Sequence, residues 1–125
     1  MKKHILIVDD EADIRDLLAQ FLTVNGYRTT AVASAAEALL VGQHDPPDLM
    51  VADLQLEDAD GLEMIAELKA MLPDEPVILL TGVSFDPEVV RDVLSTKVAC
   101  YLEKSSSLAR ILEEVQRLLG PASSP

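Results

Sequence analysis

The chain has 125 residues, which fits one domain and is too short for two of ordinary size. Almost half of the residues are apolar (49%), so the chain can bury a core and is not expected to be disordered. Ten basic and 22 acidic residues give a net charge of −12, which repels nucleic acids and anionic membranes and argues against both as direct partners.

Nothing in the sequence indicates export or membrane insertion. The single cysteine, Cys100, cannot form an internal disulfide, and a reducing compartment is the usual setting for such a chain. No apolar run approaches the roughly 20 residues that a membrane helix needs. Residues 1–4 lead directly into an apolar run and lack the cleavage site of a signal peptide. We therefore expect a cytoplasmic protein.

Strand-like and helix-like segments alternate along the first half of the chain. Residues 5–8 form a continuous apolar run, which is typical of a strand buried on both faces of a parallel sheet. A helix is predicted over residues 14–22, because apolar side chains recur there at the spacing of one helix face. These side chains are Ile14, Leu17, Leu18, Phe21 and Leu22. Residues 27–32 predict a second strand, an S-x-x-E capping box starts a short helix over residues 34–40, and residues 49–52 predict a third strand.

The second half of the chain repeats this alternation. A helix is predicted over residues 62–72, followed by a strand over residues 77–80. Asp86 as a cap and Pro87 in the first turn predict a fourth helix over residues 87–94. A fifth strand is predicted over residues 98–102 and a last helix over residues 108–119. Five successive strand–helix units predict a parallel sheet that is covered by helices on both faces.

Residues suited to phosphate or metal chemistry follow four of the predicted strands. They are Asp9 and Asp10 after the first strand, Asp53 after the third, Thr81 after the fourth and Lys104 after the fifth. Parallel α/β sheets bind ligands outside the carboxyl ends of their strands, so we expect these side chains to meet. Three carboxylates alone would repel one another, whereas a divalent cation, most naturally Mg²⁺, removes the conflict. With a hydroxyl and an ammonium, the set indicates a site for a cation and a phosphoryl group.

Each of these residues also has an ordinary structural explanation when it is taken alone. Asp9 or Asp10 could cap the following helix, Thr81 could bond the backbone, and Lys104 could be a solvated surface lysine. Their coincidence at the ends of four strands favours the functional interpretation. His4 has no partner at ligand spacing and is expected on the surface.

Taken together, these motifs resemble the response-regulator receiver domains of bacterial two-component signalling. The similarity extends from Lys3 to about Gly120. It rests on the segments I-L-I-V-D-D-E (residues 5–11), Asp53, Asp60-Gly61, Thr81-Gly82 and Tyr101-Leu102-Glu103-Lys104. It implies an α/β, flavodoxin-like fold: a doubly wound parallel sheet in strand order 2-1-3-4-5 with helices on both faces. It also implies a receiver domain over residues 1–120, with residues 121–125 as a tail or the start of a linker.

The resemblance implies roles for the acidic residues. Asp53 would accept a phosphoryl group from the phosphohistidine of a sensor histidine kinase or a histidine phosphotransfer protein. Asp10, Asp53 and the backbone carbonyl of Gln55 would hold Mg²⁺, and Asp9 would act on the metal through water. The chain would then be a phosphoacceptor, which promotes its own phosphorylation and dephosphorylation only, rather than an enzyme with other substrates.

Three further matched residues would respond to phosphorylation. Lys104 would pair with Asp53 before the reaction and with a phosphoryl oxygen after it. Thr81 would move to another phosphoryl oxygen, and Tyr101 would turn inward as Thr81 leaves room. The added charge and acceptor oxygens can tip a two-state element in this way. The surface of the fourth helix, fifth strand and fifth helix would change and would meet a downstream protein, a fused output domain or a second copy in a homodimer.

The chain departs from the family pattern at three loops. Ser105 follows Lys104 where the family usually has a proline after a cis bond, and a cis bond before a non-proline residue costs about 3 kcal/mol. We therefore expect a trans bond at this position. Glu57 also replaces a usual proline, and the glycine common before the fifth strand is replaced near Lys97-Val98. These changes affect loop geometry and partner choice more than the catalytic groups.

Two alternative functions follow from the same residues. One is a receiver-like docking module that is not phosphorylated, which Ser105 and Glu57 leave open. The other is a phosphatase of the haloacid-dehalogenase type, which needs a D-x-D pattern on the first strand where this chain has D-D-E, and for whose common cap domain the chain has no room. A flavin- or nucleotide-binding protein is disfavoured, because the first strand–helix turn has no glycine-rich loop.

Overall fold

A computed structural model describes residues 2–53, 56, 61–81 and 98–120. Five parallel strands form one sheet, in the order β2-β1-β3-β4-β5. The strands are β1 (His4–Val8), β2 (Arg28–Val32), β3 (Leu49–Asp53), β4 (Val77–Thr81) and β5 (Cys100–Glu103). The parallel sheet and its strand order confirm the predicted flavodoxin-like architecture.

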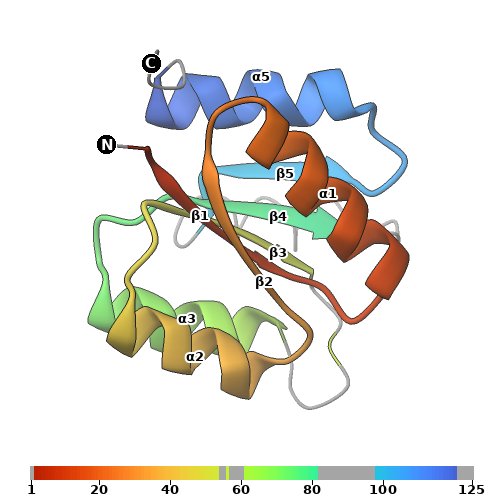
Figure 1. Cartoon of the computed structure of the whole chain (residues 1–125). Coiled ribbons are helices and arrows are strands. Elements are labelled where there is room, and N and C mark those ends of the chain that lie inside the picture. The colour runs from red at the N-terminus through yellow and green to blue at the C-terminus, as the bar shows by residue number, and fades with distance from the viewer. Residues whose placement is uncertain (1, 54–55, 57–60, 82–97, 121–125) are drawn as a thin grey trace.

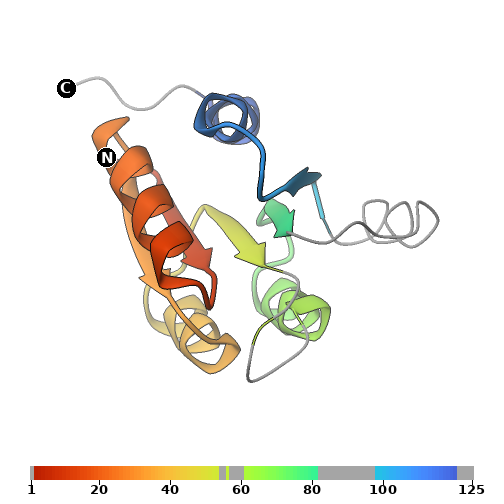
Figure 2. The same ribbon diagram turned by 90° about the vertical axis from the view of Figure 1, so that its right-hand side faces the viewer.

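Helices cover both faces of the sheet, as predicted. The described helices are α1 (Ala12–Val24), α2 (Ala35–His44), α3 (Gly61–Met71) and α5 (Leu108–Leu119). Figures 1 and 2 show α1 and α5 on one face and α2 and α3 on the other. The helix predicted over residues 87–94 lies outside the described residues.

The sheet separates two apolar cores. On the side of α1 and α5, Ile5, Ile7 and Leu49 of the strands pack with Leu18, Leu22, Ile111 and Val115 of the helices. On the side of α2 and α3, Leu6, Val8 and Met50 pack with Ala38, Ile65 and Leu68. The central strands β1 and β3 are buried along their whole length, which explains their unbroken apolar sequences.

The structure corrects two predictions about individual residues. His4 is buried rather than exposed: its backbone N–H donates to Asp48 Oδ2 at 2.8 Å, and its Nε2 lies 2.7 Å from Thr30 Oγ1. Leu17, predicted on the same apolar helix face as Leu18 and Leu22, is 51% exposed, whereas Leu18 and Leu22 are buried. The apolar stripe on α1 is therefore narrower than its sequence spacing indicates.

The predicted limits of four strands lie within one residue of the observed ones, and the largest difference is at the edge strand β5. The second strand begins at Arg28 rather than Tyr27, and the fifth strand begins at Cys100 rather than Val98. Val98 is nevertheless buried, so the apolar run marks burial there rather than strand pairing. In the chain that the structure describes, no helix combines the length and apolar character needed to cross a membrane.

Serine side chains cap two of the described helices, and one of them is the predicted capping box. Ser34 Oγ accepts a hydrogen bond from the Glu37 N–H at 3.2 Å, which caps α2. Ser107 Oγ caps α5 in the same way through the Arg110 N–H at 3.1 Å. α5 ends at Gly120, where φ is +80°, a conformation that favours glycine.

Candidate functional site

The register of the sheet brings the predicted site residues to one edge. β1 and β3 are paired so that Val8 lies opposite Ala52, and Asp9 therefore lies beside Asp53 at their carboxyl ends. Thr81 pairs with Glu103 across β4 and β5, so Lys104 follows at the same edge. The chain runs outward in opposite directions from β1 and β3, which makes this edge the switch point where ligands bind in such sheets.

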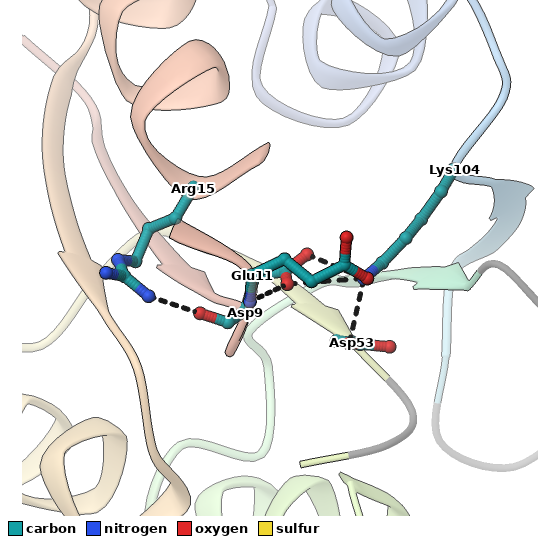
Figure 3. A network of polar contacts seen from close by, with 5 residues as sticks. All are labelled: Asp9, Glu11, Arg15, Asp53 and Lys104. Atoms are coloured by element: carbon teal, nitrogen blue, oxygen red, sulfur yellow. Dashed lines mark hydrogen bonds and ion pairs between the residues drawn. The ribbon is translucent and has the colours of Figure 1, made fainter. Parts of the chain in front are cut away.

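Lys104 joins three carboxylates at this edge. Its Nζ donates to Asp9 at 3.2 Å, to Glu11 at 2.8 Å and to Asp53 at 3.0 Å, and Figure 3 shows the three contacts converging on the ammonium. The Lys104 side chain is 10% exposed, and those of Asp9 and Asp53 are 2% and 6% exposed. The contacts are therefore charge-assisted hydrogen bonds at a largely buried position.

The contacts shift the protonation of Lys104 and Asp9. Burial alone would lower the pKa of Lys104, but hydrogen bonds to Glu11, Asp53 and Asp9 outweigh it and hold this pKa well above its usual value. Burial raises the pKa of the Asp9 carboxyl, although the Glu11 N–H and the Lys104 ammonium act in the opposite direction. Lys104 thus supplies a permanent positive charge between the acids.

The carboxylates at this edge also form a group that fits a metal ion. One carboxylate oxygen from each of Asp9, Asp10, Glu11 and Asp53 lies within 4.8 Å of the others. Four oxygens this close suit a hard divalent cation such as Mg²⁺, which prefers carboxylate ligands. The predicted acids Asp9, Asp10 and Asp53 are thus brought together, and Glu11 joins them.

Glu11 and Arg15 were not predicted to take part. The Glu11 N–H donates to Asp9 Oδ1 at 2.8 Å, and Arg15 Nη1 donates to the backbone carbonyl of Asp9 at 2.9 Å (Figure 3). Together they hold Asp9 at both its side chain and its backbone. The sequence signal for Glu11 was its place directly after the two acids, and Arg15 follows four residues later on the same side of α1.

The structure describes three other predicted residues to different extents. Gln55 lies outside the described residues, and of Thr81 only the backbone, at the end of β4, is described. Tyr101 is half-buried on β5 and packs against the core on the side of α2 and α3. No peptide bond within the described residues is cis, so the bond between Lys104 and Ser105 is trans, as expected.

Comparison with known proteins identifies the family. A family profile described as the response regulator receiver domain matches residues 5–116. This chain belongs to the response-regulator receiver family. This chain is 32% identical to the response regulator MprA of Mycobacterium ulcerans over an alignment that covers 95% of this chain and 51% of that protein. It is 37% identical to the transcriptional regulatory protein GlrR of Escherichia coli over 87 residues, which cover 70% of this chain and 20% of GlrR.

Solved structures agree with this assignment. The receiver domain of NtrX from Brucella abortus is 32% identical and superposes with a TM-score of 0.85, covering 92% of this chain and 97% of that one. A CheY-like receiver domain protein of Methanospirillum hungatei is 28% identical with a TM-score of 0.87, covering 94% and 93% of the two chains. The present chain spans about half of the length of MprA and a fifth of the length of GlrR.

Proposed function

We propose that this receiver domain is a phosphoacceptor switch in which Asp53 takes a phosphoryl group from a phosphohistidine. The observation that carries the proposal is the contact of the Lys104 ammonium with Asp53, 3.0 Å apart, at the switch point of the sheet and beside two further acids. A lone buried aspartate would be poorly placed to react with an anion. Here a fixed positive charge lies directly against it.

The reaction is a displacement at phosphorus. One carboxylate oxygen of Asp53 attacks the phosphorus atom in line with the bond to the histidine nitrogen. That bond breaks with its electron pair going to the imidazole, and an acyl phosphate forms on Asp53. Both reactants are negative, so Lys104 assists by neutralising charge that builds up on the phosphoryl oxygens.

A divalent cation would complete this site. We assign Asp10 and Asp53 as ligands of Mg²⁺, with Asp9 acting through water and the Gln55 carbonyl as a further ligand. The close approach of the carboxylate oxygens supports the assignment. Bound Mg²⁺ would supply the additional positive charge that phosphoryl transfer to a carboxylate needs.

The change at Asp53 would reach the surface through Thr81 and Tyr101. Thr81 ends β4 next to β5, and Tyr101 lies on β5 opposite Leu79. We propose that Thr81 moves to a phosphoryl oxygen and that Tyr101 turns inward, altering the surface of residues 87–94, β5 and α5. In this surface α5 carries Arg110 and Arg117, each 2.6 Å from Glu114. A charged face of this kind suits a downstream protein, a fused output domain or a second copy of the chain.

The domain limits follow from the same proposal. We place the receiver domain at residues 1–120 and regard residues 121–125 as a tail or linker. The Tyr27 hydroxyl donates to the Gly120 carbonyl at 3.2 Å, which ties the end of α5 to the start of β2. A sensor histidine kinase or a histidine phosphotransfer protein would be the phosphodonor.

A phosphorylation assay tests the proposal. The chain is incubated with Mg²⁺ and acetyl phosphate and then weighed by mass spectrometry. We expect a gain of one phosphoryl group in the wild type and in Asp74→Asn, which alters an exposed aspartate at the other end of the sheet. The gain should be lost in Asp53→Asn. A folded wild type without the gain would indicate a docking module, and steady phosphate release from unrelated phosphomonoesters would indicate a phosphatase.

A further inference from the structure

Glu11 occupies the N-cap of α1 but does not cap the helix. The residues favoured at an N-cap (Ser, Thr, Asp and Asn) accept a hydrogen bond from the first turn through their short side chains, whereas the Glu11 side chain makes no such bond. Its carboxylate instead accepts from Lys104 at 2.8 Å, the shortest of the three contacts of that ammonium (Figure 3). Its backbone N–H donates to Asp9. Glu11 is therefore tied to two site residues through two different groups.

The three described acceptors of Lys104 differ in their burial and in their part in the proposed metal site. Asp9 and Asp53 are buried acids that also belong to the proposed metal site, so the ammonium and a bound cation would compete for their negative charge. Glu11 belongs to the same group of four carboxylates, but its side chain is 59% exposed at the rim of the site, and it is not one of the assigned Mg²⁺ ligands. A contact with Glu11 keeps the ammonium in place while drawing less on the charge of the two buried acids.

We propose that Glu11 is a positioning residue that holds the Lys104 ammonium at the rim, so that the buried acids remain available to Mg²⁺. The inference rests on the proposed function, because it concerns the loading of the same site. Removing the charge of Glu11 would change the Mg²⁺ affinity in two ways that act in the same direction. Among the described residues, the ion pairs of Lys104 are then with Asp9 and Asp53 only, and one negative charge would be lost near a bound cation. Both effects weaken Mg²⁺ binding.

Titration calorimetry of Mg²⁺ tests the inference without an activity assay. The chain has no tryptophan to report binding by fluorescence, so heat is the appropriate signal. We expect Glu11→Gln to bind Mg²⁺ roughly three- to tenfold more weakly than the wild type, as for the loss of a partly exposed charged hydrogen bond.

The matched control is Glu103→Gln. Glu103 is exposed and precedes Lys104 directly, and its carboxylate accepts a hydrogen bond from Ser105 Oγ at 3.4 Å. The change removes the same charge from the neighbourhood of the site. We expect its Mg²⁺ affinity to stay within about twofold of the wild type, because screened surface charges interact weakly. Equal affinities for Glu11→Gln and Glu103→Gln would overturn the inference.

Repeating the titrations in a Lys104→Met background shows whether Glu11 affects Mg²⁺ binding by positioning the Lys104 ammonium or only through its own charge. Without the ammonium, Glu11→Gln should weaken Mg²⁺ binding no more than Glu103→Gln does. An equal loss from Glu11→Gln in both backgrounds would contradict a role through Lys104. The comparison in the wild-type background stands even if Lys104→Met does not fold. A wild type that binds no Mg²⁺ would overturn the proposed function as well, whereas binding that is insensitive to Glu11 would overturn this inference alone.

Discussion

Glu75 illustrates how the surroundings of one residue control its charge. It directly precedes Pro76 and β4, is 6% exposed, and has no hydrogen-bond partner for either carboxylate oxygen within the described part of the chain. Lys69 donates to its backbone carbonyl at 2.7 Å rather than to the carboxylate. Burial raises the pKa of Glu75 to about 7, with the charge of Lys69 opposing this shift and that of Asp48 adding to it.

This raised pKa predicts a loss of stability as the pH rises. Unfolded Glu75 ionises near pH 4.5, whereas folded Glu75 keeps its proton until about pH 7. Between these values the unfolded state is favoured by up to about 3 kcal/mol, since one pKa unit corresponds to about 1.4 kcal/mol. Glu75→Gln removes this penalty. We expect its free energy of unfolding, relative to the wild type, to rise by about 2–3 kcal/mol from pH 5 to pH 8.

Urea denaturation across this pH range measures the difference. Glu67→Gln is the control, because Glu67 is an exposed glutamate on α3. Its stability should follow that of the wild type at every pH. A Glu75→Gln curve that runs parallel to the wild type from pH 5 to pH 8 would show that Glu75 ionises normally in the folded chain.

At the scale of elements, the contact between α2 and α3 depends on a glycine. A Cβ added at Gly42 would lie 2.6 Å from Leu68 Cδ1 and 3.4 Å from Met71 Cε. Leu68 is fully buried in the core on that side of the sheet, so it has little room to move. The glycine lets the two helices approach more closely than an alanine would.

Gly42→Ala therefore has two opposing effects on the free energy of unfolding, one from helix propensity and one from packing. Alanine in a helix gains about 1 kcal/mol over glycine, whereas overpacking a core costs about 1–3 kcal/mol. We expect the packing cost to prevail and the free energy of unfolding to fall by about 1 kcal/mol. Leu68→Val shortens the side chain by one carbon and removes Cδ1 from the contact, so the double variant should be more stable than the sum of the two single changes allows. A stabilised Gly42→Ala chain would contradict the tight contact.

The sequence predicts which segments are strands and helices better than it predicts the limits of the strands or the width of the buried helix face. The unbroken apolar runs of β1 and β3 indicate central strands because both faces of these strands are buried. The edge strands β2 and β5 have one unpaired side and mixed burial, so their sequences lack the unbroken apolar run of a central strand. Leu17 was misplaced because helical spacing cannot show how wide a stripe the sheet covers.

At the scale of the whole molecule, the site depends on how the sheet is ordered. Asp9, Asp53 and Lys104 meet because β1, β3 and β4 are neighbours and β5 follows β4. Strand ends and strand order were enough to predict this meeting. The contact from Glu11 could not be predicted, because the sequence places Glu11 beside the two acids but only the folded chain shows where its side chain points.

The charge of the whole molecule bears on how cations stabilise it. A net charge of −12 opposes folding by self-repulsion, and any salt relieves part of it. A bound cation does more, because each tenfold rise in free Mg²⁺ above its dissociation constant adds about 1.4 kcal/mol to the free energy of unfolding. We therefore expect MgCl2 to raise the melting temperature further than NaCl at equal ionic strength.

Two variants of equal charge separate the site from the general effect. Asp10→Asn and Asp74→Asn each remove one negative charge, but only Asp10 belongs to the carboxylate group at the switch point. The advantage of MgCl2 over NaCl should disappear in Asp10→Asn and persist in Asp74→Asn. If the two salts stabilised the wild type equally, the stabilisation would come from screening of the whole surface, because a bound ion acts by mass action and screening depends only on ionic strength.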